Sequence, residues 1–179
     1  MIGTVVAGLA GLAGVILGGW LSMRNQDRMA QREHERQWRD VRLRFYNDFL
    51  AAHRKYVAFI LEPTAQITAA PHPRSPGRLM PFFDEAGRPY KELLEAGFTA
   101  MRLVALSPDT VSTAVQMVTD ARQLAAARAT CSAADLPSDL FRSLWEAEQG
   151  FLKAASREVV YGFDLIRGFA PASGWGPHR

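Results

Sequence analysis

The chain has 179 residues, its 21 basic residues include only three lysines, and its formal net charge is +3. Residues 24–44 hold seven arginines and four acidic residues, a surplus of +3, so the fourteen basic and fourteen acidic residues elsewhere cancel. A nucleic-acid-binding domain needs a basic surface of its own, and this balance argues against one. The single cysteine, Cys131, excludes an internal disulfide and fits a reducing compartment.

The first segment, residues 1–23, predicts a transmembrane anchor. Residues 2–23 form a run of 22 residues without a charge. A helix of this length rises about 33 Å, enough to cross a hydrocarbon core of about 30 Å. A cleaved signal peptide is one alternative, but no Lys or Arg precedes the run and no Ala-x-Ala site closes it. A buried core helix is another, and such helices seldom run this long without a polar face.

The charges on either side of the anchor predict its orientation. Only the terminal amine precedes it, whereas four arginines follow it at four-residue spacing: Arg24, Arg28, Arg32 and Arg36. By the positive-inside rule the arginine side lies in the cytoplasm and the N-terminus outside. We therefore expect a single-pass protein of the cytoplasmic (plasma) membrane. The nearest arginines would attract anionic lipid headgroups by about 1 kcal/mol each.

Small residues recur every four positions in the anchor. They are Ala10, Gly14, Gly18 and Ser22. Such stripes let membrane helices approach closely, and residues 14–18 form a GxxxG motif. The stripe therefore predicts self-association of the anchor, with a chance match in a Gly- and Ala-rich segment as the alternative.

The anchor is expected to continue as a helix into a stalk and then into a domain, because residues 24–61 contain neither Pro nor Gly. Residues 24–37 lack an apolar stripe and predict a solvated, arginine-rich helical stalk. From Trp38 onward apolar residues recur with the period of a helix, which predicts a core-facing helix over 38–61. The stripe comprises Trp38, Val41, Phe45, Phe49, Ala52, Tyr56, Phe59 and Ile60.

Residues 62–81 are the one irregular stretch. They contain five prolines and Gly77, which no regular helix tolerates. We expect a long Pro-rich loop, disordered or acting as a contact surface, with at most a short helical turn over 64–70. No run in the chain alternates with period two long enough to predict a strand.

Three more helices are predicted, followed by a flexible tail. They cover 90–106, 108–128 and 138–167, and the tail is 168–179. Ser107 is placed as the N-cap of the second, with Pro108 at its first position and Asp109 in its first turn. Apolar positions predicted to face inward include Leu93, Val115 and Trp145. The predicted fold is all-α, an antiparallel four-helix bundle over 38–167 behind the anchor and stalk.

Motifs for chemistry are missing from the sequence, so we expect no catalytic, cofactor-binding or metal-binding site. His34-Glu35 begins like a zinc-protease motif, but Trp38 stands where the second histidine is needed. No Gly-x-Ser-x-Gly elbow and no phosphate-binding glycine loop occur. Arg102 and Arg122, which interrupt apolar helix faces, are the most pocket-like polar residues, although an arginine extending from a helix edge explains each of them too.

The layout resembles a broad group of small actinobacterial membrane-anchored helical proteins of no known activity. The resemblance covers most of the chain and rests on the anchor, the stalk and residues 44–52, 101–108 and 151–158. These are packing motifs, so the resemblance implies an architecture and no activity, and no functional residue is carried over.

Two functions are compatible with this layout. The first is a membrane-tethered scaffold, an interaction module that holds an unknown cytoplasmic protein partner at the membrane without catalysis. The second is a homo-oligomeric structural element assembled through the small-residue stripe. An enzyme with an unrecognised site is a third hypothesis, which a closed polar pocket with convergent titratable groups would favour.

Overall fold

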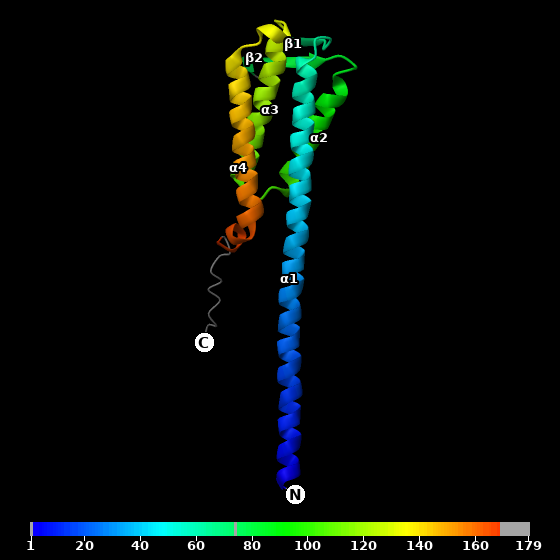
Figure 1. Cartoon of the computed structure of the whole chain (residues 1–179), viewed down its shortest axis with the longest axis vertical. Helices are drawn as coiled ribbons and strands as arrows, with labels where there is room; N and C mark the ends of the chain where they lie inside the picture. The colour runs from blue at the N-terminus through cyan, green and yellow to red at the C-terminus, as the bar shows by residue number, and fades with distance from the viewer. Residues whose placement is uncertain (1, 74, 169–179) are drawn as a thin grey trace. The chain divides into compact units, whose positions relative to one another are not determined.

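The computed structural model describes residues 2–73 and 75–168, with side chains at Met29 and over 33–160 apart from 74, 76 and 78. Within this part the chain forms four α-helices and one two-stranded antiparallel sheet (Figure 1). The protein is thus mostly helical, as predicted. Contacts divide it into two compact units, Met1–Asp40 and Val41–Arg179.

The first unit consists of the N-terminal part of helix α1 (Ile2–Leu61). Near its end the Trp38 indole N–H donates to Nε2 of His34, one turn earlier, over 3.0 Å. No helix in the part with described side chains has the length and apolar character needed to cross a membrane. The predicted anchor, residues 1–23, lies outside that part, so the membrane span stays a prediction.

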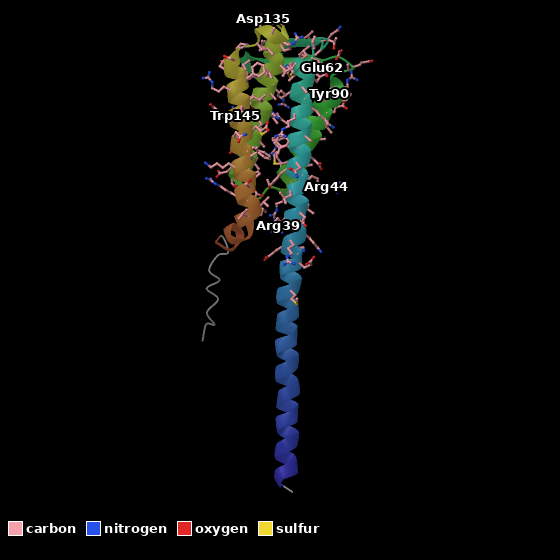
Figure 2. All side chains as sticks on the ribbon, in the orientation of Figure 1. Arg39, Arg44, Glu62, Tyr90, Asp135 and Trp145 are labelled. Carbon is pink, nitrogen blue, oxygen red and sulfur yellow. The ribbon has the colours of Figure 1, made fainter. Side chains whose placement is uncertain are left out.

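The second unit contains the end of α1 and all remaining elements. They are β1 (Ile67–His72), β2 (Ser75–Phe83), α2 (Arg88–Val104), α3 (Pro108–Arg128), the short 3-10 helix η1 (Ala133–Asp135) and α4 (Ser138–Gly168). Side chains from all four helices fill the space between them (Figure 2) and form one hydrophobic core. As predicted, the hydroxyl of Ser107 caps α3 by accepting the N–H of Asp109.

The core is built on a seam along α1. The residues along the middle of this seam are buried and alternate spacings of three and four, the pattern of one helix face: Tyr46, Phe49, His53, Tyr56 and Ile60. Leu50, Ala52 and Phe59 beside them are buried as well. Phe151 of α4 packs edge-on against this seam, with its ring centroid 5.3 Å from that of Phe49. Each such aromatic side chain contributes about 1.5–3 kcal/mol by leaving water.

On the other three helices the buried face is narrower than the apolar stripe in the sequence. Leu93, Val115 and Trp145, all predicted to face inward, are exposed. Their neighbours Leu94 and Leu144, which belong to the same predicted apolar faces, are buried, and so is Ala114. A helix has about 100° of rotation per residue, so one position separates the core from the surface.

Residues 67–72 and 75–83 form the two strands of a β-hairpin, and the prediction of an irregular loop with a helical turn over 64–70 was wrong there. The two strands pair antiparallel from Ile67 opposite Phe83 to Pro71 opposite Leu79, with an irregularity before His72. Both strands pack against α3. The all-α expectation is therefore corrected to a helical unit that carries a small sheet.

The prolines fit the hairpin because of their register. Pro71 pairs with Leu79 and Pro81 pairs with Ala69, two positions apart along the ladder. Antiparallel pairs two positions apart have the same hydrogen-bond type. Proline has no backbone N–H to donate, so both prolines fit at pairs of the non-hydrogen-bonded type. At such pairs the N–H of each residue would point away from the neighbouring strand, and proline is tolerated.

A buried carboxylate joins three helices. Glu158 of α4 is almost fully buried, and its Oε1 accepts the Tyr46 hydroxyl of α1 at 2.5 Å and the Leu106 N–H at 2.8 Å. Its Oε2 accepts the Ser107 N–H at 3.0 Å and the Thr110 hydroxyl at 2.8 Å. The carboxylate also lies at the N-terminus of α3, where the helix dipole favours a negative charge.

We predict that Gly87→Ala destabilises the protein whereas Gly77→Ala does not. A Cβ at Gly87 would lie 2.6 Å from Cε1 of Phe59 and 2.9 Å from Cβ of Phe83, while one at Gly77 meets nothing within 4 Å. Overpacking of this kind costs about 1–3 kcal/mol, against less than about 0.5 kcal/mol for an open surface site. Chemical denaturation of the purified full chain measures both. Equal stability of the two variants would contradict the packing described here.

Glu158→Ala is expected to lower the free energy of unfolding by about 3 kcal/mol or more, because it leaves several buried donors without an acceptor. Tyr46→Phe removes one of these donors and should cost about 1 kcal/mol. Glu146→Ala, an exposed acid on the same helix, is the matched control and should change stability by less than about 0.5 kcal/mol. The same denaturation experiment ranks the three variants, and a loss in Glu158→Ala no larger than in the control would refute this role.

Candidate functional site

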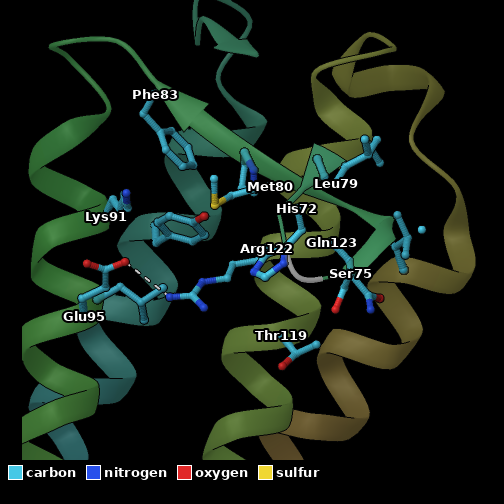
Figure 3. A pocket seen from close by; sticks show the side chains of 17 residues that line it. His72, Ser75, Leu79, Met80, Phe83, Lys91, Glu95, Thr119, Arg122 and Gln123 are labelled. Carbon is cyan, nitrogen blue, oxygen red and sulfur yellow. Dashed lines mark hydrogen bonds and ion pairs between the residues drawn. The ribbon is translucent and has the colours of Figure 1, made fainter. Parts of the chain in front are cut away.

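A cavity of about 620 Å³ lies in the second unit between the hairpin, α2 and α3. Figure 3 shows β2 crossing above it, α2 on one side and α3 on the other. It falls within the range of small-molecule sites, about 300–1,000 Å³. The residues that line it are Tyr56, His72, Ser75, Gly77, Leu79, Met80, Pro81, Phe83, Lys91, Leu94, Glu95, Thr119, Arg122, Gln123, Ala126, Ala127 and Leu140.

One side of the cavity is apolar and is anchored by the core. Tyr56, from the α1 seam, is only 1% exposed, and its ring lies 5.4 Å from that of Phe83. Burial, and then the nearby Glu95 carboxylate, raise the pKa of Tyr56, while Arg122 opposes them. Its hydroxyl therefore stays protonated, and it makes no hydrogen bond to another described residue.

The other side carries charges. Nη2 of Arg122 on α3 lies 3.3 Å from Oε1 of Glu95 on α2, the pair joined by a dashed line in Figure 3. Both side chains are about half exposed, at 51% and 47%, and such pairs contribute little to stability. Lys91, one turn before Glu95, adds a second cation to the lining, and His72 approaches from β1.

The lining thus combines apolar walls with a few polar groups, a combination that small-molecule sites share. In such sites the apolar walls contact the body of an organic molecule, and the polar groups fix its orientation. Among the described residues, no cluster of three or more His, Cys, Asp and Glu side chains is arranged to hold a metal ion.

A second unusual group is His53, in the middle of the α1 seam. It is 1% exposed, and neither ring nitrogen has a hydrogen bond of normal geometry in the described part of the chain. Burial lowers its pKa, and Arg54 acts in the same direction. Glu148 of α4 and then the Met117 backbone of α3 oppose the shift, as does Asp120.

The buried Asp120 belongs to a separate polar contact between α3 and α4. Its Oδ1 accepts the Gln116 amide at 2.8 Å, and its Oδ2 accepts the Ser143 hydroxyl at 2.8 Å. Glu148 is paired with Arg54, which donates to it through two nitrogens. Both acids near His53 thus have partners of their own.

Most of the site residues predicted from the sequence fall outside the described side chains. This applies to the basic residues Arg24, Arg28 and Arg32 and to the stripe of Ala10, Gly14, Gly18 and Ser22. Arg36 is described and is exposed on α1. The lipid contact and the self-association of the anchor therefore stay predictions.

The two arginines singled out in the helices differ in their surroundings. Arg122 lines the cavity, whereas the Arg102 guanidinium lies over the ring of Phe98, 5.5 Å from its centroid. The rest of the cavity was not predicted from the sequence, because the hairpin that covers it was not predicted either. The sequence correctly placed Tyr56 in the core stripe. The spacing of apolar residues could not show that this side chain also lines a cavity.

Comparison of the chain with models of protein families, with curated proteins and with solved structures finds no match.

We predict that His53 makes the protein less stable below pH 6.5. Because burial lowers its pKa, the unfolded chain takes up a proton near pH 6.5 while the folded chain does not. Stability is thus complete above this pH and falls as the pH decreases, by up to about 1.4 kcal/mol per pH unit. Denaturation between pH 5 and 8 measures the slope. His53→Leu should flatten it, and His34→Gln, an exposed histidine, should not; parallel curves for the two variants would disprove the assignment.

Proposed function

We propose that the protein is a single-pass membrane protein whose helical domain holds a protein partner at the cytoplasmic face of the membrane. The observation that carries this proposal is the order of segments along one helix. Residues 2–23 are uncharged, four arginines follow at four-residue spacing, and the compact unit begins at Val41. Helix α1 runs from Ile2 to Leu61, which supports an anchor that continues into a spacer.

The spacer has a defined length and charge. Fourteen helical residues, 24–37, rise about 21 Å. Its first arginines would lie within a Debye length, about 8 Å, of anionic headgroups, and the positive-inside rule places them in the cytoplasm. The N-terminus would then lie outside and the domain inside.

The domain supplies the proposed contact surface. We take it to be an antiparallel four-helix bundle, in which the exposed faces are free for a partner. Trp145 on α4 is 64% exposed, and tryptophan is the residue type most often found at the energetic centre of protein interfaces. It is therefore the first residue to test.

The experiment is chemical crosslinking of the full chain in native membranes, followed by purification and mass spectrometry. The proposal expects a stoichiometric protein partner that survives replacement of the anchor by an unrelated one. Trp145→Ala should reduce the crosslinked yield at least tenfold, while Gln149→Ala, an exposed polar neighbour, should not. In spheroplasts, external protease should leave the domain intact. Digestion from outside, or no partner other than the chain itself, contradicts the proposal.

The alternative, a homo-oligomeric membrane element, rests on the small-residue stripe of the anchor. It predicts self-crosslinks alone, and it predicts that Gly14→Ile combined with Gly18→Ile dissolves them because bulky side chains block close helix approach. An unchanged oligomer size in detergent would remove this alternative.

A further inference from the structure

We propose that the cavity between the hairpin, α2 and α3 binds a small amphipathic carboxylate, an organic anion with an apolar body. This inference goes beyond the tethering role and does not depend on it, because every lining residue belongs to the unit Val41–Arg179. It rests on three features of the cavity: its apolar walls, its surplus of positive charge and an unpartnered hydroxyl.

The walls fit an apolar body. Tyr56 and Leu94, which line it, are 1% and 2% exposed, and Phe83 and Met80 of the hairpin line the same space. On α3 the wall is made of the small residues Ala126 and Ala127. Because no larger side chain fills the gap beneath β2, about 620 Å³ remains open.

The charges favour an anion over a cation. Lys91 and Arg122 carry permanent positive charges, and Glu95 is the only acidic residue in the described lining. Lys91 forms no ion pair with another described residue. Arg122 contacts Glu95 through one nitrogen, so most of its five donors stay available for a bidentate carboxylate.

The hydroxyl of Tyr56, which lines the cavity, supplies a third contact. It stays protonated and has no hydrogen-bond partner among the described residues, so it can donate to a ligand in the cavity that Tyr56 lines. In Figure 3 the guanidinium of Arg122 extends from α3 toward Glu95 on α2, and its charge is close enough to Tyr56 to oppose the rise of the tyrosine's pKa. A carboxylate placed there would accept from a cation and a neutral donor together.

Glu95 gives this proposal an unusual signature. It pairs with the guanidinium that an anionic ligand needs, so ligand and Glu95 compete for Arg122. Removing the Glu95 charge should therefore tighten binding, while removing the Arg122 charge should weaken it. A pair that served only the fold would not give opposite effects on ligand affinity.

The test is calorimetric titration of the purified full chain in detergent with naphthalene-2-carboxylate and with its neutral isostere, naphthalene-2-carboxamide. The carboxylate should bind saturably at one site and about tenfold more tightly than the amide. Arg122→Gln should weaken carboxylate binding about tenfold, and Tyr56→Phe about fivefold. Glu95→Gln should tighten it about threefold.

Arg142→Gln is the matched control, because Arg142 is an exposed arginine of α4 outside the lining. It should bind the carboxylate as the unmodified chain does, and thermal unfolding verifies that every variant is folded. Absence of saturable binding, equal affinity for carboxylate and amide, or equal losses in Arg122→Gln and Arg142→Gln would overturn the proposal. Partition of the carboxylate into detergent is the same for all variants and therefore cancels when the variants are compared with one another.

Discussion

The buried carboxylate of Glu158 is the interaction on which the domain depends. Burying a charge is costly unless it is fully hydrogen-bonded, and Glu158 has four donors from three parts of the chain. Tyr46 fixes the register of α1, the N–H groups of Leu106 and Ser107 fix the α2–α3 connection, and Thr110 fixes the first turn of α3. The aromatic contacts of Phe151, two turns earlier on α4, then follow from this registration.

At the other end of the domain, the hairpin takes the place of helix-on-helix packing and covers a space that side chains fill only in part. Its strands contact α3, and Phe83 contacts the rings of Tyr56 and Phe59. The close approach at Gly87 lets the chain pass from the hairpin into α2 against Phe59, with the Asp84 carboxylate accepting the Gly87 N–H at 2.9 Å. The cavity thus exists because a short sheet, rather than a side chain of the core, closes this end.

The sequence predicted the helices well and the hairpin not at all. Helical period and the Ser107-Pro108-Asp109 junction placed α3 because they act locally. In β1 and β2 the alternation is interrupted by Pro71 and Pro81, and only pairing across the hairpin, a non-local contact, makes these prolines acceptable. The strands therefore show no alternation of apolar and polar residues from which they could have been predicted.

The candidate site was predictable only in part, for a similar reason. Arg122 was noticed in the sequence because it interrupts an apolar helix face. The cavity beside it is closed by the hairpin, and the spacing of apolar residues did not predict that hairpin. Glu158 had no signal, since an acid on a helix is usually solvated, and its four donors come from residues 48 to 112 positions away. Buried polar networks of this kind are set by tertiary packing.

The prolines of the hairpin also disfavour the pairing of its edges with strands of other molecules. A two-stranded sheet has two open edges, and exposed edges are templates on which further strands from other molecules add. Pro71 removes an outward donor from the edge of β1, and Pro81 removes one from the edge of β2. A sheet that offers an incomplete ladder on both sides resists extension into aggregates, so the hairpin can lie at the surface without recruiting another copy.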